Sequence, residues 1–480
     1  MRNLTINQLA DIIGGAYIGH NGALDKKVRG IKDRTGKIRE GDVYFPERMK
    51  KELLTGAYQR LEGIPQCICS VIDKEMLGGS PGGVTPYILV DDYTDAVGKL
   101  VSSLRPMVTE PIISITGSVG KTCTTGMVSQ VLSQQYKTYK SNYYENVPWN
   151  YHEPIYEMYK GKYEVGVFEA AEMTAERYGD FSPDFMVATN VGEAHIEDFS
   201  NRDRIFKVML DMIETVRPTG RCYVDGCDDY LKSVALDKPR GIKMFGMSHE
   251  LEYHPENIIN YGIKGVNCDL VHCKDRVNVT IPVPGLHFVN AALISFAIGL
   301  EFGVSLEKIK AGIENYKTAK LRSKVYETGF ISIIEDTYNS SPKSVKAAAD
   351  TLSALDGRKV MIWGDMLKLG EHTEKMHEET LRHIANSKVD VLISVGAKGV
   401  SSMRDAVSVR AGVSIMKTIE STNDKRLEFI RLPDQLELLD TLERVVKKGD
   451  SIFVKGDADV NKSFHKAVLA LLEYDDLRHS

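Results

Sequence analysis

The sequence predicts an α/β protein of three domains, and three observations carry this prediction. The chain has 480 residues, which is too long for a single hydrophobic core. From Pro111 onward, short apolar runs alternate with helical stretches, as in a parallel sheet covered by helices. A second alternating unit of this kind begins near residue 319. We therefore expect domains at 1–106, 107–318 and 319–480.

The N-terminal part predicts a small α/β domain. Its apolar residues are spaced for a short helix over 6–13, and short strands with turns follow, such as 41–45. Residues 80–84 read Ser-Pro-Gly-Gly-Val, which indicates a loop. The stretch from Pro106 to Pro111 marks the expected end of this domain.

The central part predicts a mostly parallel sheet with flanking helices. Its expected strands are 111–116, 164–168 and 185–189, and its expected helices include one that ends near 134 and one over 203–216. Residues 267–283 alternate like antiparallel strands, and 287–302 read as a helix that is apolar on all sides.

The C-terminal part predicts a Rossmann-like α/β domain. Its expected strands are 331–334, 359–362, 389–393, 427–430 and 451–454. A helix is expected after Ser341, because Pro342 suits a first helical turn and Val345, Ala348 and Leu352 share one face.

Composition narrows the class of protein. The net charge of −5 argues against nucleic acid as the main partner, and no apolar run approaches the roughly 20 residues that span a bilayer. The N-terminus has no apolar segment typical of a signal peptide. Seven scattered cysteines, an odd number, indicate reduced thiols and a cytoplasmic protein, which we expect to be a monomer. Cys222, Cys227, Cys268 and Cys273 leave a zinc site open as an alternative.

A glycine-containing loop between a strand and a helix predicts a phosphate-binding site. The loop comprises Thr116, Gly117, Ser118, Val119, Gly120, Lys121 and Thr122. Its backbone N–H groups and the helix N-terminus suit phosphate oxygens, the lysine can reach the β- and γ-phosphates, and the Thr122 hydroxyl can bind Mg²⁺. Only two residues separate the glycines, against four in the general pattern. The alternative is a glycine turn that binds no phosphate.

The shortened loop and four further segments resemble the Mur ligases, and most closely the branch that adds D-alanyl-D-alanine to UDP-N-acetylmuramoyl tripeptide. The four segments are Thr-Asn-Val-Gly-Glu-Ala-His-Ile-Glu at 189–197, Glu-Asp-Thr-Tyr-Asn-Ser-Ser-Pro-Lys-Ser at 335–344, Gly-Asp-Met-Leu-Lys-Leu-Gly-Glu at 364–371 with His377 beyond, and Gly-Asp-Ser-Ile-Phe-Val-Lys-Gly at 449–456. The resemblance covers about 110–475 well and 1–105 poorly.

The resemblance implies an ATP-dependent, ADP-forming ligase that activates a carboxylate as an acyl phosphate, which an amine then attacks. It assigns Lys121 to the β- and γ-phosphates, Thr122 and Glu169 to one Mg²⁺, and His195 to a second Mg²⁺. Arg322 would approach the γ-phosphate and Asp336 the ribose. Lys121, Glu169, His195 and Arg322 would act in catalysis. His377 and Asp365 are expected to order the C-terminal domain. The linker at 316–321 is expected to be a hinge.

Four departures from the family pattern concern substrates and the second metal. Met209 stands where the family has a carbamylated lysine, and we hypothesise that Lys207 or Asp211 supplies the missing ligand. The family's adenine-binding segment keeps only Asn290, displaced by one residue, which either binds adenine or bridges a buried helix. Residues 145–149 and 50–54 replace an acceptor-side segment and a UDP-side segment, although Asp33-Arg34 and 41–45 of the N-terminal domain are kept.

These departures leave alternatives open. The chain is either the D-alanyl-D-alanine-adding enzyme or a paralogue that joins an amine to a non-peptidoglycan carboxylate. Further alternatives are a nucleotide-binding partner subunit without turnover and a kinase that stops at phosphoryl transfer. The expected small-molecule partners are ATP, a carboxylate such as a nucleotide-sugar peptide, and an amino acid or dipeptide amine.

Overall fold

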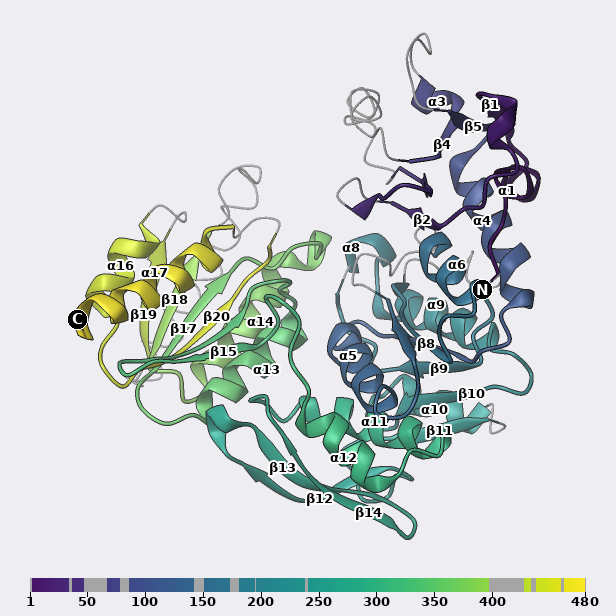
Figure 1. The fold of residues 1–480 in the computed structure, drawn as a ribbon. Coiled ribbons are helices and arrows are strands. Elements are labelled where there is room, and N and C mark those ends of the chain that lie inside the picture. Colours follow the sequence, from purple (N-terminus) through teal and green to yellow (C-terminus); the bar gives the residue numbers. More distant parts are fainter. Residues whose placement is uncertain are drawn as a thin grey trace. The chain divides into compact units, whose positions relative to one another are not determined.

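The computed structural model describes residues 2–33, 37–46, 67–77, 86–141, 151–172, 181–194, 196–237, 241–396, 427–432, 437–458 and 462–479. Within these ranges the strands form four sheets, drawn as arrows in Figure 1. Among the helices of the same ranges, none has both the length and the apolar character that a membrane crossing needs.

The first sheet lies in the N-terminal part of the chain. Its order is β1-β5-β4-β3-β2, with β1 (Ala16–Ile18), β2 (Gly30–Lys32), β3 (Asp42–Tyr44), β4 (Cys69–Asp73) and β5 (Tyr87–Val90). β1 is antiparallel to β5, and the other pairs are parallel. The helices of this part are α1 (Ile6–Ile13), α3 (Lys74–Leu77) and α4 (Tyr93–Leu104).

Helix α1 has the bounds that the apolar spacing predicts. Thr5 and Gln8 form a capping box at its start, and Gly14 ends it in the left-handed conformation at φ 68°. Ile6, Leu9 and Ile13 are buried on one face, so the helix is held by packing as well as by its caps.

The second sheet contains the strand that precedes the phosphate loop. Its order is β11-β10-β9-β6-β8-β7, with β6 (Ile112–Thr116), β7 (Thr138–Lys140), β8 (Val165–Glu169), β9 (Phe185–Ala188), β10 (Arg221–Asp225) and β11 (Ile242–Phe245). β6 and β8 are parallel, and every residue of both strands is buried, as their continuous apolar runs predict.

Seven helices are described between β6 and the end of the central part. They are α5 (Lys121–Leu132), α6 (His152–Tyr159), α8 (Ile196–Phe199), α9 (Arg202–Glu214), α10 (Leu231–Asp237), α11 (Phe288–Glu301) and α12 (Leu306–Glu314). Eleven of the 14 residues of α11 are buried, which confirms the prediction of a helix that is apolar on all sides.

A separate antiparallel sheet stands between β11 and α11. It consists of β12 (His254–Asn260), β13 (Val266–His272) and β14 (Asp275–Ile281), in that order. β13 and β14 confirm the alternation seen over 267–283. β12 was not predicted, because its exposed half, Asn257–Asn260, gives the strand no alternating pattern.

The fourth sheet belongs to the C-terminal part. Its order is β15-β16-β20-β17-β18-β19, with β15 (Lys324–Glu327), β16 (Ser332–Asp336), β17 (Lys359–Gly364), β18 (Val391–Val395), β19 (Glu428–Leu432) and β20 (Ser451–Lys455). The pairs are parallel except for the antiparallel edge strand β15. The helices of this part are α13 (Pro342–Ser353), α14 (Thr373–Ala385), α16 (Leu438–Val445) and α17 (Lys462–His479).

The fourth sheet is buried on both faces. Neighbouring residues of β16 point to opposite sides, with Ile334 in one apolar cluster together with Leu352 of α13. Ile333 lies in a second cluster with Phe464 of α17. Two cores with one sheet between them are the doubly wound arrangement, so the α/β fold class is confirmed.

Contacts group the chain into two compact units. The first comprises 1–116, 136–187 and 208–222, and the second comprises 117–135, 188–207 and 223–480. The domain boundaries expected from the sequence stay a prediction.

Candidate active site

The phosphate loop connects β6 to α5 and requires two glycines. Gly117 has φ +134°, and a Cβ there would lie 2.0 Å from the Thr189 hydroxyl oxygen. Gly120 is the N-cap of α5 at φ +91°, and no side chain caps the helix. Both conformations favour glycine, and the uncapped helix end leaves backbone N–H groups for an anion. The loop therefore fits a phosphate ligand.

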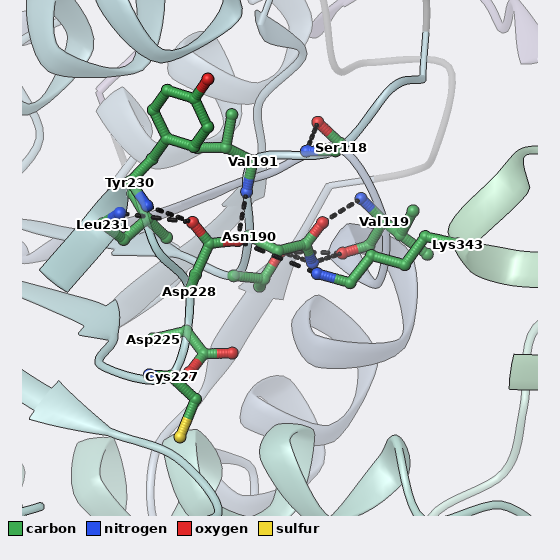
Figure 2. Close-up of polar contacts among 12 residues, drawn as sticks. Ser118, Val119, Asn190, Val191, Asp225, Cys227, Asp228, Tyr230, Leu231 and Lys343 are labelled. Atoms are coloured by element: carbon green, nitrogen blue, oxygen red, sulfur yellow. Dashed lines mark hydrogen bonds and ion pairs between the residues drawn. The ribbon is translucent and has the colours of Figure 1, made fainter. Parts of the chain in front are cut away.

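Residues 189–192 clamp this loop. Thr189 Oγ1 and Asn190 Nδ2 both donate to the Val119 carbonyl, at 2.8 and 2.7 Å. Asn190 Oδ1 accepts from the Val119 amide at 3.2 Å, so one side chain binds both the N–H and the C=O of Val119 (Figure 2). The Gly192 amide adds a bond to Ser118 Oγ at 2.9 Å. Hence residues 189–192 hold the phosphate loop in this conformation.

Lys121 extends back over the loop from the first turn of α5. Its Nζ donates to the Gly117 carbonyl at 2.5 Å, which places the ammonium beside the glycine that opens the loop. Thr122 follows it and is half-buried. A cation and a helix N-terminus at one loop suit the phosphates of a nucleotide.

Asp228 supports the clamp from the end of β10. Its Oδ2 accepts from the Val191 amide at 3.0 Å, and its Oδ1 accepts from the Tyr230 amide at 3.1 Å. Lys343 Nζ of α13 lies 3.9 Å from the same carboxylate (Figure 2). Residues 189–192 are therefore fixed on both sides, by the loop and by Asp228.

Asn290 of α11 is held by a second carboxylate, Asp225. Its Nδ2 donates to Asp225 Oδ2 at 3.1 Å, while Asp225 Oδ1 accepts from the Cys227 amide at 2.9 Å. Burial raises the pKa of Asp225 to about 6. Asn290 Oδ1 is buried and has no hydrogen-bond partner among the residues described. The amide thus bridges α11 to β10 and also presents an unused acceptor, so both sequence interpretations of Asn290 find support.

Glu169 ends β8 and is only 4% exposed. The register of β6 and β8 pairs it with Ile115, two residues before the loop glycine Gly117. The carboxyl edge of a parallel sheet is where ligands of such folds bind. A buried carboxylate at this edge suits a cation, and its role as a Mg²⁺ ligand with Thr122 stays a prediction. His195, expected to bind a second Mg²⁺, lies outside the residues that the structure describes.

Arg322 and Asp336 belong to the start of the C-terminal part. The Arg322 guanidinium lies 3.9 Å from the centre of the Tyr338 ring, so it stacks on an aromatic face. Asp336 ends β16, and its carboxylate accepts from Lys455 Nζ of β20 at 2.7 Å. Their expected roles toward the γ-phosphate and the ribose stay predictions.

The linker expected to be a hinge carries unusual backbone. Leu321 has φ 61° and Ser323 has φ 44°, both in the left-handed region that non-glycine residues seldom adopt. The Tyr338 amide donates to the Leu321 carbonyl at 3.2 Å. The hinge itself stays a prediction.

Met209 lies on the buried side of α9. It is fully buried, whereas Lys207 and Asp211 are exposed on the same helix. This arrangement gives no support to Lys207 or Asp211 as the replacement ligand, and that hypothesis stays untested. Arg34 and the segments 50–54 and 145–149 lie outside the described part of the chain.

His377 orders the C-terminal part, as the sequence suggested. Its Nε2 accepts from the Met366 amide at 3.1 Å, its Nδ1 faces the Thr373 carbonyl at 2.8 Å, and its ring stacks on Trp363. Burial lowers its pKa, which favours the neutral ring that these two bonds require.

The structure does not support a zinc site formed by cysteines. All seven cysteines are free thiols, as predicted, and Cys222, Cys227, Cys268 and Cys273 form no metal-ligating group in the part of the chain that is described.

Sequence reasoning missed five residues that build this site. Thr189 and Asn190 stood in a segment from which only the histidine received a role, and Lys455 stood in the terminal motif without one. The family motifs that contain Thr189, Asn190 and Lys455 could have indicated these three residues. Asp225 and Asp228 carry no motif, and only the folded structure brings them to the clamp and to Asn290.

Comparison with known proteins agrees with this geometry. The family model of the Mur ligase middle domain matches residues 115–299, and that of the Mur ligase, glutamate ligase domain matches residues 322–458. A UDP-N-acetylmuramoyl-tripeptide–D-alanyl-D-alanine ligase of Bacillus subtilis (strain 168) is 27% identical over 410 residues, which cover 82% of this chain and 86% of that protein.

Two solved structures share the fold. MurF from Acinetobacter baumannii has a TM-score of 0.81 and 22% identity, covering 98% of this chain and 99% of its own. A MurF ligase from Thermotoga maritima in complex with ADP has a TM-score of 0.74 and 19% identity, covering 94% of this chain and 99% of its own.

Proposed function

Since this chain belongs to the Mur ligase family, and is therefore an ATP-dependent, ADP-forming amide ligase, we propose that it joins UDP-N-acetylmuramoyl tripeptide to D-alanyl-D-alanine. The Bacillus subtilis relative carries that name and aligns with most of both chains. The proposed acid is a nucleotide-sugar peptide, and the proposed amine is a dipeptide. A cytoplasmic, monomeric protein stays a prediction from the sequence.

The observation that carries the proposal is the preformed phosphate loop. Asn190 and Thr189 hold the backbone of Val119, and Lys121 lies over Gly117, so the loop backbone and a cation are already placed together for phosphate. In the proposed site these groups hold the β- and γ-phosphates. Arg322 adds positive charge near the γ-phosphate, and its stacking on Tyr338 limits where the guanidinium can move.

The proposed reaction has two balanced steps. A substrate carboxylate oxygen attacks the γ-phosphorus, the bond to the β-bridging oxygen breaks, and an acyl phosphate and ADP result. The amine nitrogen then attacks the acyl carbon, loses a proton, and expels inorganic phosphate as the amide forms. Loop N–H groups, Lys121 and Arg322 stabilise the charge that develops on the transferring phosphoryl group. Bound Mg²⁺ would spread that charge further, with Thr122 and Glu169 as the proposed ligands of one ion and His195 as a proposed ligand of a second.

The adenine is proposed to meet Asn290. Asp225 accepts from Asn290 Nδ2, so Asn290 Oδ1 is left to accept a hydrogen bond from a ligand. The exocyclic amino group of adenine is such a donor, and guanine offers a carbonyl oxygen in its place. Asn290, held by Asp225, is therefore expected to favour ATP over GTP.

The test is a matrix of acids and amines incubated with ATP, with release of phosphate and mass of product as readouts. The proposal expects release only when UDP-N-acetylmuramoyl tripeptide and D-alanyl-D-alanine are both present, with a product of the summed mass less water. Release that requires another acid would establish a paralogue with a different substrate. A folded, ATP-binding chain that releases no phosphate with any pair would contradict the ligase proposal.

A further inference from the structure

Three potential metal ligands gather where the antiparallel sheet begins, away from the phosphate loop in the chain. His249 lies in the segment before β12, and His254 and Glu256 lie at the start of that strand. One ligand atom from each lies within 4.8 Å of the others, and no other group of this kind occurs among the residues described. Because strand residues two apart share a face, His254 and Glu256 project together while Pro255 between them is buried.

The distances suit a single ion. His254 Nε2 and Glu256 Oε1 are 3.4 Å apart. Two ligands that each bind Zn²⁺ at about 2.1 Å in tetrahedral geometry lie about 3.4 Å from each other. The pair is therefore already spaced for a metal, and His249 requires only a small rotation because it is exposed.

Hydrogen bonds to other groups orient two of the three ligands. His254 Nδ1 faces the Leu251 carbonyl at 2.9 Å, and because a carbonyl only accepts, Nδ1 carries the proton. In the neutral ring the lone pair is then on Nε2, which faces Glu256 Oε1. The other oxygen of Glu256 is held by Arg276 at 2.6 Å. A backbone carbonyl behind a histidine and a cation behind a carboxylate are typical outer partners of metal ligands.

The His249 ring lies edge-on to the His254 ring, with the ring centroids 5.6 Å apart. The exposed histidine therefore already stands beside the pair formed by His254 and Glu256.

We propose that His249, His254 and Glu256 bind a divalent transition-metal ion, with Zn²⁺ as the best match. Two imidazole nitrogens and one carboxylate oxygen are ligands that Zn²⁺ takes readily, and they are unsuited to Mg²⁺, which prefers an all-oxygen shell. Water completes the fourth position at the exposed side. The ion ties residues 247–252 to β12 and stabilises the folded chain.

The experiment uses the full chain, freed of metal with chelator and titrated with Zn²⁺ at pH 7.5 by calorimetry. The wild-type protein is expected to bind one equivalent. His249→Ala and Glu256→Gln are expected to bind at least about tenfold more weakly. His383→Ala is the matched control, since this partly exposed histidine pairs with Asp350 in the C-terminal part. Circular dichroism checks that the variants fold, and the same concentration of Zn²⁺ should raise the Tm of the wild type more than that of His249→Ala.

Substitution by Co²⁺ separates this site from the cysteines. The proposal expects visible d–d bands without a thiolate charge-transfer band, and expects those bands to remain in Cys273→Ser. Absence of Zn²⁺ binding in the wild type, unchanged binding in His249→Ala, or a thiolate band in the Co²⁺ spectrum would each overturn it.

Discussion

At the residue scale, the site depends on a few polar side chains that hold backbone groups. Asn190 binds both the amide and the carbonyl of Val119, and Asp228 binds the amide of Val191 on the other side. Neither touches substrate in this account, so both are positioning residues. Their effect on catalysis passes through the shape of the phosphate loop.

Replacing Asn190 with alanine should weaken ATP binding without unfolding the protein. Two hydrogen bonds to the backbone of Val119 are lost, worth about 1–3 kcal/mol together, which corresponds to a roughly 5- to 150-fold loss of affinity. Calorimetric titration with ATP measures this change. Asn278→Ala, at an exposed asparagine of β14, serves as the control and should bind ATP normally. Equal ATP affinity in the two variants would refute the clamp.

Replacing Asp225 with asparagine should change how stability depends on pH. The pKa of Asp225 is raised from 3.8 to about 6, so the folded state favours the protonated form. Burying the charged form therefore costs stability above pH 6, and this cost disappears as the pH falls through 6 toward 4. A pKa shift of this size corresponds to a loss of at most about 3 kcal/mol in the free energy of unfolding.

The difference in unfolding free energy, Asp225→Asn minus wild type, should accordingly rise by up to about 3 kcal/mol from pH 4 to pH 8. Urea unfolding across that range measures it. Asp229→Asn, at an exposed carboxylate beside Lys232, should show no such rise. A difference that stays flat with pH would mean that Asp225 titrates normally.

At the scale of elements, helix α14 is tied to the end of β17 through one histidine. His377 accepts from the Met366 amide, which needs a neutral ring, and the ring also stacks on Trp363. His377 thus serves the architecture of the C-terminal part, as expected from the sequence.

His377→Ala should lower the unfolding free energy by about 2–3 kcal/mol at pH 8, because the buried Met366 amide loses its partner and a cavity remains.

The wild type should also lose stability as the pH falls below 6.5. The pKa of His377 is lowered in the fold, so the unfolded chain takes up the proton first. His383→Ala controls for a partly exposed histidine. Equal stability of both variants at pH 8 would contradict the assignment.

At the scale of the whole molecule, the sequence predicted the regular parts well. The spacing of apolar residues predicted helix 6–13, the buried strands of the central sheet and the doubly wound C-terminal part. In each case the fold buries the apolar residues of the pattern. The strands β7, β11, β12 and β15 escaped prediction, because partly exposed edge strands carry no such pattern.

The candidate site was predictable only where it lies in a local motif. The phosphate loop and Lys121 are contiguous, so their spacing already indicates phosphate binding. Asp225 and Asn290 are 65 residues apart, and their hydrogen bond exists only because β10 and α11 pack together. His249, His254 and Glu256 are close in sequence, yet their metal-like geometry depends on the turn that returns His249 to the strand.

The most direct test of the central claim follows oxygen from the acid to phosphate. In the proposed chemistry a carboxylate oxygen attacks the γ-phosphorus and leaves with it. UDP-N-acetylmuramoyl tripeptide labelled with ¹⁸O in its reacting carboxylate should therefore transfer one labelled oxygen to the inorganic phosphate, in a turnover that requires D-alanyl-D-alanine. Amide product formed together with unlabelled phosphate would contradict activation as an acyl phosphate.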